Sequence, residues 1–120
     1  MEEVKTEEKM LKIAIVGTRR FDNYNKFKEL VLPILHNYQY DTIVSGGAVG
    51  VDTLAKRLAN ELNKNMLEFL PGNKSPLMRN TKIVLHSDII IAMPCANSTG
   101  TYDTIRKANK QGKTVIKIKL

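Results

Sequence analysis

The sequence predicts an α/β fold in which helices cover both faces of one five-stranded parallel sheet, with the strand order 3-2-1-4-5. Short apolar runs alternate with helix-length segments along the 120 residues, and parallel strands need connections of this kind. Because such crossovers are right-handed, few strand orders remain possible. The runs at 12–16 and 88–93 are almost entirely aliphatic, as expected of central strands that are buried on both faces.

Five apolar runs predict the strands. They are KIAIV at 12–16, DTIV at 41–44, NMLEFL at 65–70, DIIIAM at 88–93 and TVIKIKL at 114–120. The last run alternates Ile116 and Ile118 with Lys117 and Lys119. Lysines at alternate positions are suited to an exposed strand at the edge of the sheet.

Two of the segments between the strands are predicted to be helical from their periodicity. Apolar residues in 51–62 recur at i, i+3, i+4, i+7, i+8 and i+11, which places them on one stripe of a helix. Segment 24–38 is also predicted to be a helix, although Pro33 lies inside it.

The other two helices are predicted from their ends. Ser75 followed by Pro76 is typical of an N-cap and a first turn, and this helix would extend to about His86. Gly112 follows the last helical segment and would end it.

Length and composition exclude several classes of protein. With 42% hydrophobic residues, the chain is expected to form a single domain at 11–120, after a flexible charged tail at 1–10. No apolar run approaches the roughly 18 to 20 residues of a membrane span, and no signal peptide is evident, so a cytoplasmic protein without a membrane partner is expected. Cys95, His36 and His86 are the only cysteine and histidines, which predicts no metal site.

The net charge is +7, which favours polyanionic partners. Lysines that are scattered over helix faces are equally typical of an ordinary solvated surface, so the charge alone leaves nucleic-acid binding open.

Three unusual loops are expected to meet at one edge of the sheet. They are GTRRF at 17–21, SGGAVG at 45–50 and PCANSTGT at 94–101, and each precedes a predicted helix. Ligands of open parallel sheets bind at the carboxyl ends of the strands where the strand order reverses. A helix start offers free N–H groups, and glycines let a phosphate approach them. The loops therefore predict a site for a phosphorylated small molecule.

The same residues resemble the SLOG superfamily, which includes the DprA/Smf DNA-processing proteins, the LOG phosphoribohydrolases and small stand-alone nucleotide-binding domains. The resemblance covers about 12–118 and is carried by IVGTRRF, IVSGGAVGVDTLAKRLA, Arg79-Asn80, SDIIIAMP and NSTGT. The first loop is most similar to that of the stand-alone branch. The resemblance implies a three-layer Rossmann-like domain that binds nucleotides or ligands derived from NAD or ADP-ribose, as a homodimer or a larger homo-oligomer.

This resemblance also implies which residues contact a nucleotide-type ligand, while no cofactor is certain. They are Gly17, Thr18, Arg19, Ser45, Gly46, Gly47, Gly50, Asp52, Arg79, Asn97, Ser98, Thr99, Gly100 and Thr101. Some of these residues have a second interpretation. Asp52 is suited to a ribose hydroxyl and equally to the helix dipole, and Ser98 and Thr99 could be ordinary helix caps. Cys95 is expected to be a small packed residue and not a nucleophile.

One departure from the LOG pattern favours binding over catalysis. The LOG hydrolases carry PGGxGTxxE with a catalytic glutamate, whereas this chain reads PCANSTGTYDT and places Thr104 at that position. Cleavage of an N-glycosidic bond needs a nearby carboxylate. Asp103 is one residue away, and Asp52 is the other candidate.

Three functions follow from these observations. Binding of a phosphorylated nucleoside or of an NAD-derived molecule is favoured, for sensing, carrying or sequestering it. A nucleotide N-glycosidase that uses Asp103 or Asp52 is the second possibility. Binding of single-stranded DNA is the third, with few aromatic residues to stack on bases: three Phe, four Tyr and no Trp.

Overall fold

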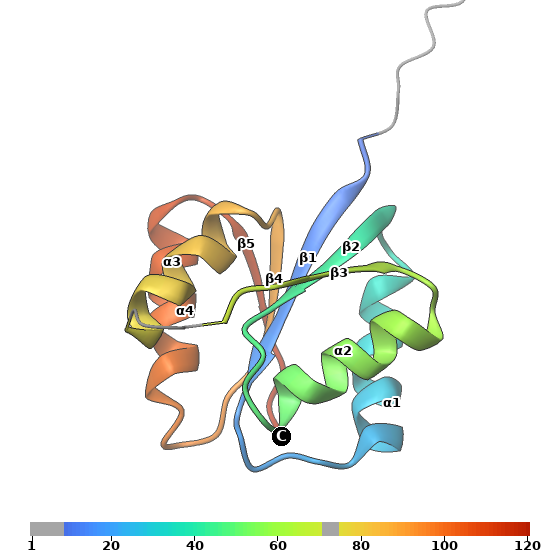
Figure 1. The fold of residues 1–120 in the computed structure, drawn as a ribbon, viewed down its shortest axis with the longest axis horizontal. Helices are drawn as coiled ribbons and strands as arrows, with labels where there is room; N and C mark the ends of the chain where they lie inside the picture. The colour runs from blue at the N-terminus through green and yellow to red at the C-terminus, as the bar shows by residue number, and fades with distance from the viewer. Residues whose placement is uncertain (1–8, 71–74) are drawn as a thin grey trace, which may run out of the picture.

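A computed structural model describes residues 9–70 and 75–120 of the chain. Its five strands are β1 (Leu11–Gly17), β2 (Tyr40–Ser45), β3 (Asn65–Glu68), β4 (Ile89–Met93) and β5 (Thr114–Lys117). They form one parallel sheet in the order β3-β2-β1-β4-β5 (Figure 1). The predicted fold class and strand order are confirmed. Residues 1–8 of the predicted tail lie outside the described residues.

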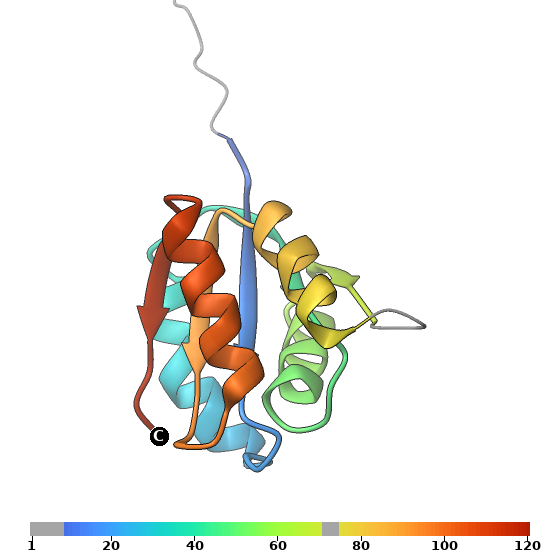
Figure 2. The ribbon, with the colours of Figure 1, turned by 90° about the vertical axis from the view of Figure 1, so that its left-hand side faces the viewer.

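Four helices cover the two faces of this sheet (Figures 1 and 2). They are α1 (Tyr24–Leu35), α2 (Val51–Glu61), α3 (Pro76–Leu85) and α4 (Thr99–Lys110). The first two pack on one face and the last two on the other, so that three layers result. Alternate residues of each strand point to opposite faces. Ile13 and Ile15 of β1 accordingly pack with α1 and α2, whereas Ala14 and Val16 pack with α3 and α4.

The helix signals are confirmed where they depended on an apolar stripe or on a cap. Val51, Leu54, Ala55 and Leu58 of α2 are buried, as the periodicity predicts. The Ser75 side chain accepts a hydrogen bond from the Met78 N–H and caps α3.

Three elements end earlier than predicted. Helix α1 ends at Leu35 and not at residue 38, because the next N–H groups make tighter bonds: Asn37 donates to Ile34 and Tyr38 to Leu35. Strand β3 ends at Glu68 and β5 at Lys117, instead of residues 70 and 120. Both are edge strands with a single partner, which ends the ladder before the apolar run ends.

Candidate functional site

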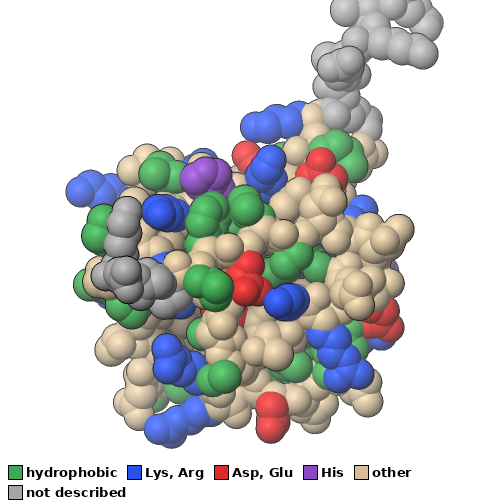
Figure 3. All heavy atoms as spheres, viewed as in Figure 1, with side chains coloured by type: hydrophobic (Ala, Val, Ile, Leu, Met, Phe, Trp, Pro, Cys, Tyr) green, Lys and Arg blue, Asp and Glu red, His purple; other side chains and the backbone are tan. Residues whose placement is uncertain are grey.

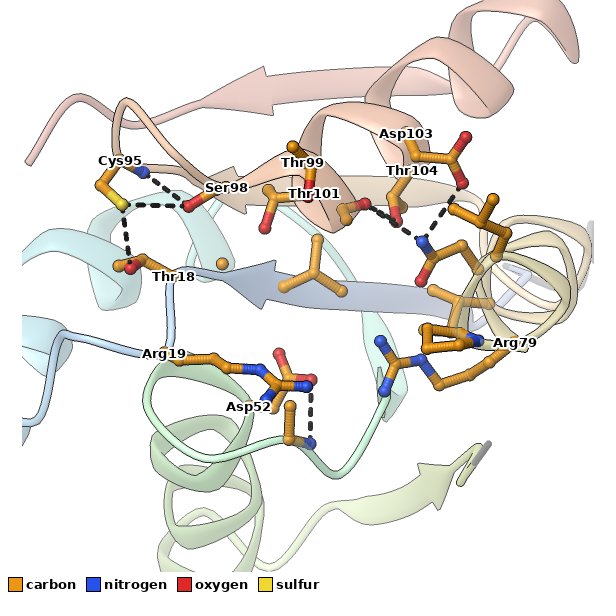
Figure 4. Close-up of a pocket in the computed structure, with 18 of the residues that line it drawn as sticks. Thr18, Arg19, Asp52, Arg79, Cys95, Ser98, Thr99, Thr101, Asp103 and Thr104 are labelled. Atoms are coloured by element: carbon orange, nitrogen blue, oxygen red, sulfur yellow. Dashed lines mark hydrogen bonds between the residues drawn. The ribbon is translucent and has the colours of Figure 1, made fainter. Parts of the chain in front are cut away.

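The three unusual loops meet at a cleft of about 590 Å³ at the carboxyl ends of β1 and β4. One side of the cleft is built by the β1–α1 loop and the start of α2, and the other by α3 and the start of α4 (Figure 4). Strand order reverses between β1 and β4. The cleft therefore lies where ligands of open parallel sheets bind.

Ten of the residues predicted to contact a ligand line the cleft: Gly17, Thr18, Arg19, Asp52, Arg79, Asn97, Ser98, Thr99, Gly100 and Thr101. The candidate Asp103 also lines it. Ser45, Gly46, Gly47 and Gly50 are not among its lining residues. Residues that the sequence did not single out for the site complete the lining: Val16, Arg20, Ala48, Pro76, Leu77, Asn80, Ile83, Cys95, Thr104 and Arg106.

The glycines of the second loop make room for other parts of the chain. A methyl group at Gly50, whose φ is +82°, would lie 2.4 Å from the Thr18 carbonyl oxygen. That carbonyl accepts the N–H of Val51, at the start of α2, at 3.1 Å. A methyl group at Gly47 would lie 2.3 Å from Leu70. The glycine at residue 50 thus lets the β1–α1 loop close over the start of α2.

The buried Asp52 and the partly buried Arg79 both lie beside Gly46. A methyl group at Gly46 would lie 3.0 Å from Nε of Arg79 and 3.1 Å from Oδ2 of Asp52. Arg79 also donates through Nη1 to the Gly46 carbonyl at 3.2 Å, and Oδ2 of Asp52 accepts the Ala48 N–H at 3.2 Å. Oδ1 of Asp52 and Nε of Arg79 are buried and have no hydrogen-bond partner among the described residues.

The burial of Asp52 changes its protonation. Only 5% of this residue is exposed, and burial raises the pKa of its carboxyl group from 3.8 to about 6. The Ala48 N–H and the positive charge of Arg79 act in the opposite direction, but they do not compensate for the loss of solvent. Asp52 therefore changes charge within one pH unit or so of neutrality.

Helix α4 begins at the cleft with an unusual cap. Ser98 is its N-cap residue, but the hydroxyl group makes no capping hydrogen bond to the helix. This hydroxyl instead accepts the N–H of Cys95 at 2.9 Å. The expectation that the Ser98 side chain caps the helix is therefore wrong. The N–H groups of Gly100 and Thr101, both at the cleft, have no partner among the described residues.

Cys95 lies in a cluster of hydrogen-bonding side chains at the cleft. Its Sγ lies 3.2 Å from the Ser98 hydroxyl and accepts a hydrogen bond from Oγ1 of Thr18, also at 3.2 Å (Figure 4). Hydrogen bonds from Ser98, from Thr18 and from the Asn97 N–H lower the pKa of this thiol from 9.0 to about 7. A thiolate is thus stabilised at the mouth of the cleft.

The two side chains at the position of the LOG glutamate are both engaged. Thr104 is buried and donates to the Gly100 carbonyl at 3.1 Å. Asp103 accepts from Nδ2 of Asn80 at 3.2 Å and forms an ion pair with Lys107 at 2.9 Å. Burial alone would raise the pKa of Asp103, but the hydrogen bonds from Lys107 and Asn80 hold it below its ordinary value. Asp103 consequently carries a charge that its neighbours neutralise.

Within 9–70 and 75–120, no helix combines the length and apolar character of a membrane span. The same residues include no group of three or more His, Cys, Asp or Glu side chains that could hold a metal ion.

These features define a three-layer α/β domain with a cationic cleft at the carboxyl edge of its sheet. The sequence model of the DNA recombination-mediator protein A family matches residues 3–75, which is more than half of the chain. The chain therefore belongs to this family. It is also 29% identical, over 119 residues, to the Gene 61 protein of Mycobacterium phage D29, a match that covers 89% of this chain and 95% of that protein.

Two solved structures of DNA processing protein A share the fold. The protein from Streptococcus pneumoniae matches with a TM-score of 0.74 and 21% identity over 90% of this chain, which shows the fold alone. The protein from Helicobacter pylori, whose structure describes a binding mode for single-stranded DNA, matches with a TM-score of 0.64 and 27% identity over 89% of this chain. This chain spans 50% of the first protein and 64% of the second.

Proposed function

We propose that the cleft binds single-stranded DNA and that a backbone phosphate lies at the start of α4. The observation that carries this proposal is the free start of that helix. Gly100 and Thr101 line the cleft, their N–H groups have no partner among the described residues, and the Ser98 hydroxyl makes no capping bond to them. Helix starts of this kind bind phosphate through their N–H groups and the helix dipole.

The other helix starts at the cleft are already occupied. The N–H of Val51, the first residue of α2, donates to Thr18, and the first turn of α2 contains Asp52. The first turn of α3 is capped by Ser75. The start of α4 has no acidic residue in its first turn. It is thus the position at which an anion would meet the least competition.

The charges of the cleft also favour an anion. Four arginines line it, Arg19, Arg20, Arg79 and Arg106, against the two acids Asp52 and Asp103, and both Arg106 and Lys107 pair with the second of these acids. Arg19 and Arg79 extend toward each other from the β1–α1 loop and from α3 (Figure 4). On the face shown in Figure 3, Lys and Arg side chains are scattered among uncharged and acidic residues. The proposal therefore rests on the cleft and not on the net charge.

Family membership favours DNA as the source of the phosphate, because the related Helicobacter pylori protein binds single-stranded DNA. A free phosphorylated nucleoside or an NAD- or ADP-ribose-derived molecule is the second candidate. It is supported by the size of the cleft, since about 590 Å³ is within the range of small-molecule sites.

The test compares two variants that lose one positive charge each. Fluorescence anisotropy would follow the binding of a labelled twelve-nucleotide oligo-dT to the parent protein, to Arg19→Ala and to Lys26→Ala. Lys26 is an exposed residue of α1 whose ion pair is with Glu29, so it controls for total charge. We expect Arg19→Ala to weaken binding about tenfold and to lower the salt slope by about one, while Lys26→Ala changes little.

Equal losses in the two variants would contradict a site in the cleft. Thermal unfolding with AMP, ADP-ribose and NAD distinguishes the second candidate. A raised midpoint with one of these compounds, together with no oligonucleotide binding at low salt, would replace DNA by a free nucleotide. No response to any of them would refute both candidates.

A further inference from the structure

Part of the α3 wall of the cleft is apolar. Pro76 and Leu77, in the first turn of α3, line it, and 52% of Leu77 is exposed. The backbone of this turn is anchored, because the Leu77 carbonyl accepts hydrogen bonds from Nζ of Lys107 at 2.6 Å and from Oγ1 of Thr81 at 3.3 Å. The exposed side chain is thus presented at the cleft by a turn that is fixed to α4.

Leu77 is connected to the start of α4 through Asn80. Asn80 follows it at i+3, which places the two residues on the same face of α3. Nδ2 of Asn80 donates to the Gly100 carbonyl at 3.1 Å, and Gly100 is in the first turn of α4. A nucleotide whose phosphate lies at the start of α4 can therefore extend its base along α3 toward Leu77.

Sites for single-stranded nucleic acid commonly stack bases on aromatic side chains. Among the described residues, none that lines the cleft is aromatic. The seven aromatic residues of the chain pack in the core or against side chains such as Arg57, His86 and Lys117. An apolar surface for a base must then come from aliphatic residues, and Leu77 is the most exposed large one in the lining.

We propose that Leu77 is the base-contacting residue of the cleft and that it packs against the face of a nucleobase whose phosphate lies at the start of α4. This inference rests on the proposed function. A nucleobase has a flat apolar face and polar edges. Such a base is suited to pack against an exposed leucine that lies between polar side chains. Such a contact is insensitive to the identity of the base, because every base has such a face.

The experiment compares an oligonucleotide with its abasic counterpart. Fluorescence anisotropy would measure the binding of a twelve-nucleotide oligo-dT to the parent protein and to Leu77→Ala. The same measurement would be made with an abasic oligomer of the same length. We expect the substitution to weaken oligo-dT binding about five- to tenfold, since it removes the apolar contact. Binding of the abasic oligomer should stay unchanged. Leu77→Met, which keeps an apolar side chain of similar volume, should restore most of the affinity for oligo-dT.

Leu85→Ala is the matched control. Leu85 is on the same helix and is 57% exposed, but it lines a separate hollow beside Asp88 and Lys113 at the other end of the sheet. Equal losses for the two oligomers, a loss with Leu85→Ala of the same size, or no loss with Leu77→Ala would overturn the inference.

Failure of the proposed function has a different signature. If the parent protein binds neither oligomer, the same comparison is made with AMP and ribose 5-phosphate. A loss that is confined to AMP in Leu77→Ala would support the contact with a free nucleotide. If neither compound binds, the inference is refuted together with the function.

Discussion

Replacing Asp52 by Asn tests the central electrostatic feature of the cleft. The folded chain raises the pKa of Asp52 from 3.8 to about 6, so the folded state holds a proton that the unfolded chain releases at lower pH. The free energy of unfolding therefore falls as the pH rises from about 4 to about 6. Above pH 6, the stability that Asp52 contributes at low pH is lost. At about 1.36 kcal/mol for each pKa unit, this loss amounts to roughly 3 kcal/mol.

Urea denaturation of the parent protein and of Asp52→Asn, at constant ionic strength between pH 4 and pH 7.5, measures this loss. The asparagine keeps an oxygen that can accept the Ala48 N–H, and it has no charge. We expect the variant to gain roughly 3 kcal/mol relative to the parent over this pH range. All other titrating groups cancel in the difference between the two proteins.

Asp103→Asn is the control of opposite sign. The pKa of Asp103 is held below its ordinary value, so its contribution to stability is lost as the pH falls. This change occurs below the ordinary aspartate pKa of 3.8. When the titration is extended below pH 4, the variant should therefore lose stability relative to the parent as the pH rises, with little further change between pH 4 and pH 7.5. A difference between parent and Asp52→Asn that does not vary with pH would refute the reasoning, since it would mean that Arg79 compensates fully for the burial of the carboxylate.

Two further predictions concern packing and reactivity at the cleft. A methyl group at Gly17 would lie 2.5 Å from the Met93 carbonyl oxygen, so Gly17→Ala should cost about 3 kcal/mol or more in urea denaturation. Gly112→Ala, at φ +69° in open space, should cost only about 1 kcal/mol, and equal costs would contradict this account. Alkylation of Cys95 by iodoacetamide should have a midpoint near pH 7, and Ser98→Ala should move it upward; an unmoved midpoint would show that the hydroxyl does not stabilise the thiolate.

The strand order of the sheet could be predicted from the sequence because central strands and edge strands differ in their apolar content. Residues 13–16 of β1 and all of β4 are apolar and buried, whereas Lys117 lies on the edge strand β5. The ends of β3 and β5 could not be predicted in the same way. The apolar run at 65–70 continues beyond Glu68, because Phe69 packs in the core after the strand has ended.

The position of the cleft followed from the strand order, but its two walls were not equally predictable. The wall formed by the three loops carries glycines, arginines and hydroxyl side chains that mark it in the sequence. On the wall formed by α3 the sequence singles out Arg79 and Asn80 but not Leu77 and Ile83, because apolar residues are expected in any helix that packs on a sheet. Their place at the cleft depends on how α3 is set against α4, which the bonds of Asn80 to Gly100 and Asp103 determine.

The glycines of the second loop have a physical cause other than the ligand that the sequence suggested. A cluster of glycines before a helix is equally consistent with an approaching phosphate and with an approaching protein segment. In this chain the segments that come close are its own: the Thr18 carbonyl at Gly50, Leu70 at Gly47, and the Asp52 and Arg79 side chains at Gly46. Because Gly46 has no side chain, the Asp52 carboxylate and the Arg79 guanidinium both come within 3.1 Å of the position that a methyl group would fill. The cleft thus keeps a cation for an anionic ligand, and the carboxylate beside it is left to titrate near pH 6.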